Sequence, residues 1–141
     1  MGEVRIKTKL FNAVDDVLAR RNEISKKEIR VYEANALVDT GAIRSVIPAF
    51  VLEQLGLQTR GMRVAEYADG RKDAVGISEP IIFNIMGRDT LEEALVLGDE
   101  VLIGQTVLEK MDLHVDCANN KVIPNPAHPD QPVSKVKLID N

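Results

Sequence analysis

Apolar and polar residues alternate strictly at the start of the chain. In EVRIKTKLF, one side carries mainly apolar residues and the other carries basic ones: Val4, Ile6, Thr8 and Leu10 against Arg5, Lys7 and Lys9. A period of two is typical of a half-buried strand. A second strand is predicted from Ile29 to Val38. We expect the charged stretch 12–28 to be an exposed connection, with at most a helical turn at Asp15–Arg20.

The middle of the chain alternates between helix and hairpin signals. After Pro48, the segment AFVLEQLGL has apolar residues at helical spacing, with Gly56 where a C-terminal cap is expected. Asp69-Gly70 then predicts a hairpin with a type I′ turn, which requires two consecutive residues with positive φ. A second hairpin is predicted around Gly87-Arg88-Asp89.

Two parts of the sequence follow the same order of apolar strand, glycine and short helix. The predicted helices share three letters, Val51-Leu52-Glu53 and Val107-Leu108-Glu109, and each is followed by a leucine, Leu57 or Leu113. This pattern indicates an internal duplication. The first copy has Asp39-Thr40-Gly41 where the second has Leu102-Ile103-Gly104, so only the first copy carries the acid.

The C-terminal segment is rich in proline, which denies it regular structure before a short strand expected at Val133 to Ile139. We therefore predict one mainly β domain over residues 1–124, with two short helices, followed by a tail over residues 125–141. A chain of 141 residues is enough for a single core.

Composition removes several classes of function. The net charge of −4 is scattered, so the chain has no basic footprint for nucleic acid or anionic lipid. A single cysteine, Cys117, and two distant histidines exclude an internal disulfide and a standard zinc site, and we expect neither metal nor cofactor. The N-terminus lacks a signal-peptide core and no stretch is long enough to cross a bilayer, so we expect a cytoplasmic protein.

The segment ALVDTGAIRSVIP, residues 36–48, carries the candidate chemistry. Asp39 directly follows three apolar residues at the end of a predicted strand, where an unpaired charge is costly. In one interpretation it is a turn residue whose side chain caps backbone amides. In the other, its carboxylate shares a proton or binds a ligand.

Five features follow one another along the chain: LVDTGA, SVIP, a short helix ending in LGL, a hairpin with ADGR at its tip, and LIGQTVLEKM. Together they resemble the retropepsin-like aspartic proteases, and most closely the small bacterial and archaeal branch of that clan. The resemblance covers roughly Val4 to Pro124. It implies a closed, all-β acid-protease barrel with internal pseudo-two-fold duplication.

The resemblance also implies an aspartic endopeptidase whose site forms at the two-fold axis of a homodimer, acting on a peptide or protein substrate. Asp39 would be the catalytic residue, one from each chain. Two neighbouring carboxylates cannot both be ionised, so one acts as base on a water and the other as acid. The second apolar-glycine motif, Leu102, Ile103 and Gly104, would occupy the corresponding place in the half that lacks the acid.

The remaining site residues are implied by the same resemblance. Thr40 would form hydrogen bonds across the dimer axis, Gly41 would allow close approach to the carboxylate, and Ala42 would begin the cleft wall and accept substrate hydrogen bonds. The hairpin tip would be a flap over the substrate, comprising Tyr67, Ala68, Asp69 and Gly70. By itself, that hairpin would be interpreted as a surface turn.

Two residues depart from the family pattern. Gln105 stands where many relatives have Arg, Asn or Asp, which removes a charge-assisted contact expected to brace the active-site loop. Arg44 either compensates or is solvated. Five further residues are interpreted as ordinary strand, turn or helix-end positions, namely Glu109, Asp112, His114, Asp116 and Cys117.

Two other functions compete with the protease. A non-catalytic dimeric peptide-binding module would have the same fold, but would have no reason to keep two facing carboxylates. Asp-x-Gly after a strand also occurs in sugar-kinase and actin-like proteins. Those folds need a much longer chain and a glycine-rich phosphate loop, neither of which is present.

Overall fold

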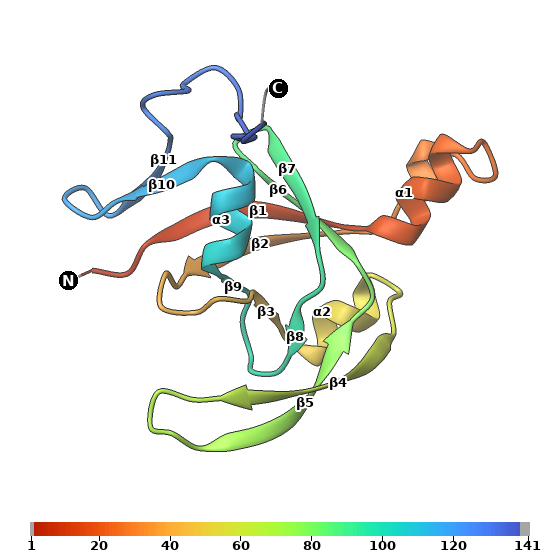
Figure 1. The fold of residues 1–141 in the computed structure, drawn as a ribbon. Coiled ribbons are helices and arrows are strands. Elements are labelled where there is room, and N and C mark those ends of the chain that lie inside the picture. Colours follow the sequence, from red (N-terminus) through yellow and green to blue (C-terminus); the bar gives the residue numbers. More distant parts are fainter. Residues whose placement is uncertain (1, 139–141) are drawn as a thin grey trace.

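A computed structural model describes residues 2–138 of the chain (Figure 1). The β-strands are β1 (Arg5–Asn12), β2 (Val31–Val38), β3 (Val46–Ile47), β4 (Thr59–Glu66), β5 (Lys72–Ser78), β6 (Ile81–Ile85), β7 (Arg88–Glu92), β8 (Leu95–Val96), β9 (Leu102–Ile103), β10 (Leu113–Asp116) and β11 (Lys121–Pro124). The helices are α1 (Ala13–Arg20), α2 (Ala49–Gln54) and α3 (Gln105–Met111), with a 3₁₀ turn at Lys26–Glu28. The mainly β class is confirmed.

Nine of the strands form one sheet in the order β4-β5-β8-β3-β9-β2-β1-β6-β7, and β10 and β11 form a separate hairpin. The sheet is curled, as Figure 1 shows. Its edge strands, β4 and β7, do not pair with each other within residues 2–138. The single chain therefore shows a half-barrel, and the closed barrel is not confirmed.

The alternation predicted at the N-terminus is confirmed in β1. Thr8 and Leu10 are buried, whereas Lys7 and Lys9 are exposed. β1 pairs with β2 on one side and with β6 on the other, both antiparallel. This position places Leu10 in a core shared with Phe83 and with the inner faces of α2 and α3.

The prediction of an exposed connection over 12–28 holds for residues 20–28, which are mostly exposed, but is wrong for the first part of that stretch. It contains α1, capped by Asn12, whose side chain accepts a hydrogen bond from Asp15 N at 2.9 Å and donates one to Leu55 O at 2.7 Å. Asp15 is buried and pairs with Arg30 at 2.9 Å. The guanidinium lowers the pKa of Asp15 by hydrogen bonding. Charge suggested exposure, but long-range partners allow these groups to be buried.

Both hairpins form, but the type I′ turn at Asp69-Gly70 is wrong. Only Gly70 has positive φ there, at 87°, and Tyr67 N donates to Arg71 O across a wider loop. Two consecutive positive φ angles occur instead in the second hairpin, at Met86 (55°) and Gly87 (78°). Arg88 consequently begins β7, opposite Ile85, and is not a turn residue.

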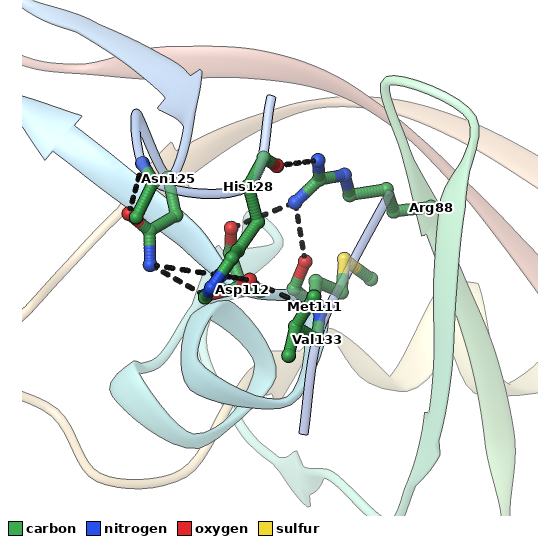
Figure 2. Close-up of polar contacts among 7 residues, drawn as sticks. Arg88, Met111, Asp112, Asn125, His128 and Val133 are labelled. Carbon is green, nitrogen blue, oxygen red and sulfur yellow. Dashed lines mark hydrogen bonds and ion pairs between the residues drawn. The ribbon is translucent and has the colours of Figure 1, made fainter. Parts of the chain in front are cut away.

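The tail forms no strand over 133–138, and Ile139 lies outside the described residues. It is held against the end of α3 instead (Figure 2). The Asp112 carboxylate contacts Asn125 Nδ2 at 2.8 Å, His128 Nδ1 at 2.6 Å and Val133 N at 3.1 Å. Arg88 donates to the carbonyls of Met111, Asp112 and His128. The Asn125 hydrogen bond, together with those from Val133 and His128, lowers the pKa of Asp112 to about 2.

None of the helices between residues 2 and 138 is long and apolar enough to cross a membrane.

Candidate active site

Asp39 follows β2 directly, and parallel pairing between β2 and β9 determines what lies beside it. Leu37 is paired with Leu102 and Val38 with Ile103, and Asp39 N donates to Ile103 O at 2.9 Å. Ile103 is fully buried in the core. The structure therefore brings Asp39 together with the segment Leu102, Ile103 and Gly104.

Backbone groups of the next residues surround the half-buried Asp39. Gly41 N donates to Asp39 Oδ1 at 3.0 Å, and Ala42 N donates to Asp39 O at 3.1 Å. A Cβ on Gly41 would lie 3.3 Å from Oδ1, closer than most side-chain carbons come to a neighbour. Glycine at 41 therefore allows the close approach that was expected. Thr40 is exposed beside them.

The start of α3 braces the loop that carries Asp39. Gln105 N donates to Ala42 O at 2.8 Å, and Thr106 holds Ile43 O through both its N–H (3.2 Å) and its hydroxyl (2.9 Å). The brace expected from a side chain at position 105 is thus supplied mainly by backbone and by Thr106.

Gly104 and Ser45 bring the loop and α3 into direct contact. Gly104 N donates to the buried hydroxyl of Ser45 at 2.9 Å. A Cβ at position 104 would lie 2.6 Å from Arg44 C and O. Only glycine fits this contact, so the close approach of the two backbones explains why the second apolar-glycine segment has a glycine at position 104.

The two departures from the family pattern have separate partners. The Gln105 amide donates to Glu109 on the exposed face of α3, at 3.2 Å. Arg44 lies 4.0 Å from Glu93, which also pairs with Arg60 of β4 at 2.5 Å. Arg44 is therefore part of a charged group linking the loop to the β4–β5 hairpin, and does not replace a contact from position 105.

A hollow of about 310 Å³ opens beside Asp39. Its walls are residues 2–4, residues 37–40 and the β10–β11 hairpin, including Val115 and Cys117. A larger hollow of about 550 Å³ lies over β1, β2 and β6, with Lys7, Lys9 and Glu33 in its lining, and contains none of the predicted site residues. Asp39 and Thr40 therefore line the smaller hollow and not the larger one.

The four hairpin residues lie at the tip between β4 and β5. Arg71 stabilises this tip, because its N–H and guanidinium both bind Asp69 and the guanidinium lies 4.9 Å from the centre of the Tyr67 ring. The backbone hydrogen bond from Arg71, and then its side chain, lower the pKa of Asp69. No hydrogen bond joins these residues to Asp39 in the described structure. In Figure 1 the tip extends on the same side as the loop between β2 and β3.

Three residues that contact the Asp39 loop or its brace were not predicted from the sequence. They are Ser45, Thr106, and Glu92, whose carboxylate accepts a hydrogen bond from the Thr106 hydroxyl at 2.9 Å. Each acts through a partner between 14 and 63 residues away. No local pattern of apolar or turn residues distinguishes them, so only the tertiary contacts reveal their role.

The fold was compared with known proteins. No protein-family model matches the sequence, and no curated protein matches it. Among solved structures, the chain is similar to the crystal structure of the retroviral protease-like domain of Ddi1 from Leishmania major. The TM-score is 0.53 and the identity 16%, over 89% of this chain and 86% of that one. At this identity the likeness establishes the fold alone, and we conclude that the chain has a retroviral protease-like fold.

Proposed function

We propose that this protein is an aspartic endopeptidase that acts as a homodimer, with one Asp39 from each chain. The observation that carries the proposal is the position of Asp39. Its carboxylate follows β2 in a loop braced by Gly104 and Thr106, within a retroviral protease-like fold. A turn residue alone would not need a brace from a distant helix.

A single chain supplies half of the catalytic pair. When two copies meet about a two-fold axis near Asp39, two carboxylates share one proton, because both cannot be ionised at close range. The ionised carboxylate takes a proton from a water held between them. The other donates to the carbonyl oxygen of the scissile bond while the water attacks, which gives a tetrahedral diol. The first carboxyl then passes its proton to the amide nitrogen and the diol returns a proton to the second carboxylate, so that the C–N bond breaks and the amine and carboxyl products leave.

The backbone around Asp39 fixes the orientation of the carboxylates. In this proposal, the N–H of Gly41 holds Oδ1 and leaves Oδ2 for the water, while Thr40 reaches across the axis. Fixed hydrogen-bond donors around developing charge are more effective than water, because they need not reorganise during the reaction.

The β4–β5 hairpin is proposed to close over an extended peptide. β4 is an edge strand, with backbone groups free to pair, and Gly70 gives its tip a residue that tolerates positive φ. The Tyr67–Arg71 contact keeps the tip ordered while the base stays joined to β8. Closure would exclude water from the reacting groups.

We also infer that the chain contains an internal duplication. β2 and β9 lie parallel and in register. β9 leads directly into α3, whereas β2 leads through β3 into α2, and the two helices share Val-Leu-Glu. Only the first segment carries an acid, which is why a second chain is required.

Cleavage of a degenerate peptide library tests the proposal, with products identified by mass spectrometry from pH 4 to 7.5. The native chain is compared with Asp39→Asn at micromolar concentration. We expect cleavage that is lost in the variant, is blocked by a statine-type inhibitor, and falls on dilution as dimers dissociate. No cleavage by a native preparation shown to be dimeric would refute the protease and favour a peptide-binding module.

A further inference from the structure

Glu92, the last residue of β7, is a buried carboxylate outside the predicted site. Its side chain is 8% exposed. Glu92 Oε2 lies 2.9 Å from Thr106 Oγ1, and Oε1 lies 3.4 Å from Lys110 Nζ. Lys110 also donates to Leu91 O at 2.9 Å. The edge strand β7 is therefore tied to α3 by two side chains.

Thr106 extends this link to the loop that carries Asp39. Its hydroxyl lies 2.9 Å from both Glu92 Oε2 and Ile43 O, and its N–H donates to the same Ile43 carbonyl. The hydroxyl has one proton for two acceptors. Because the N–H also holds Ile43, that carbonyl keeps a donor when the hydroxyl turns to Glu92.

A carboxylate is costly to bury, and an apolar side chain would fill the same space without that cost. The side chains that contact the Glu92 carboxylate in the described part of the chain are Thr106 and Lys110, both on α3. The burial of Glu92 is thus explained by the two side chains of α3 that it binds, Thr106 in the first turn and Lys110 in the last.

We propose that Glu92 is a positioning residue for Asp39, acting through Thr106. Glu92 binds the Thr106 hydroxyl, and Thr106 in turn binds the carbonyl of Ile43. The adjacent residue on α3, Gln105, binds the carbonyl of Ala42. Ala42 N then donates to Asp39 O, which completes the path. The catalytic part of this inference rests on the proposed function.

Loss of the link would let the first turn of α3 move away from β7 and would loosen the loop at Ala42 and Ile43. Small displacements of a catalytic group lower the rate of the chemical step strongly. Substrate binding along the hairpin would change less. We therefore expect kcat to fall by about tenfold or more, with KM changed by less than about threefold.

The test uses the full chain with Thr106→Val, Thr106→Ser, Glu92→Leu and Glu92→Gln. Valine has the shape of threonine without the hydroxyl, and serine keeps the hydroxyl. Glu109→Gln is the matched control, because it removes an exposed carboxylate from the same helix. Hydrogen exchange at the amides of Ala42, Gln105 and Thr106 reports on the brace directly, and kcat and KM report on its consequence.

We expect T106V and E92L to speed exchange at these amides by about tenfold and to lower kcat, while T106S and E109Q behave as the native protein. E92Q should fall between them, because its amide can still bind the hydroxyl but cannot pair with Lys110. If E92L does not fold, the comparison of T106V with T106S alone decides whether the Thr106 hydroxyl braces the Asp39 loop.

Unchanged exchange in T106V would overturn the proposal, as would faster exchange accompanied by a rise in KM alone. If the native chain cleaves nothing, the proposed function fails. The exchange rates then still decide whether Glu92 and Thr106 set the geometry of the Asp39 loop.

Discussion

Gly104 fits against the backbone of the loop that carries Asp39 with no room for a side chain. A Cβ there would lie 2.6 Å from Arg44 C and O and 2.9 Å from Ile43 O, whereas ordinary contacts begin at 3.4 Å. Substitution Gly104→Ala therefore forces the loop and α3 apart by about 0.8 Å. Both partners are backbone, so no side chain can turn aside to make space.

The size of the effect follows from two opposing terms. Overpacking of this kind costs about 1–3 kcal/mol. The φ of −89° and ψ of 174° at Gly104 suit alanine, so the smaller entropy of the unfolded chain returns about 0.4–1 kcal/mol. At the middle of both ranges, the two terms leave a net loss of about 1.3 kcal/mol in the free energy of unfolding. Displacement of Asp39 should also lower kcat by at least about tenfold.

Urea unfolding monitored by circular dichroism measures the change in the free energy of unfolding. All samples are kept at one protein concentration, because dimerisation would otherwise shift the midpoint. The matched control is Gly61→Ala, whose Cβ would lie 3.6 Å from Ile77 Cγ2, an ordinary contact. Because the same unfolded-chain entropy term applies without a steric cost, the control should gain about 0.4–1 kcal/mol in the free energy of unfolding. A G104A protein as stable as the native chain, beside a normal control, would refute the steric reasoning.

Three further substitutions test other parts of the structure. Gly41→Ala presses on the Asp39 carboxylate, so kcat in the peptide assay should fall severalfold, up to about tenfold, with little change in stability. Asn12→Ala removes the α1 cap and leaves the carbonyl of Leu55 unpaired, so urea unfolding should show a loss of about 2–4 kcal/mol. The pKa of Asp112 is lowered from 3.8 to about 2, so its stabilisation is present above pH ~4 and lost as the pH falls toward 2. Urea unfolding from pH 6 to 2 should therefore show the advantage of the native chain over Asp112→Asn shrinking across that window.

Each of these expectations has an outcome that contradicts it. Native kcat in G41A would mean that the carboxylate has room to move. A loss well under 1 kcal/mol in N12A would mean that water replaces both hydrogen bonds of the amide. A difference between native and D112N that stays constant with pH would show that Asp112 is not held as an ionised group by Asn125, Val133 and His128.

Local patterns predicted the elements of this fold wherever one face of the chain is buried. The period of two in β1 and the helical spacing of α2 follow directly from burial on one side. The prediction failed in the first part of 12–28, because charge alone could not show that Asn12 and Asp15 find partners at Leu55 and Arg30. It failed again at the hairpin turns, where the choice between Asp69-Gly70 and Met86-Gly87 depends on strand register.

By itself, the sequence determined the position of the acid and its glycine, because Asp39-Thr40-Gly41 and Ile103-Gly104 are contiguous motifs next to apolar strands. It did not determine what holds them. Ser45, Glu92 and Thr106 act across 59, 14 and 63 residues, and Asp112 holds the tail across 13 to 21. Hydrogen bonds between distant residues leave no local pattern in the chain, so they became visible only when the tertiary structure brought their partners together.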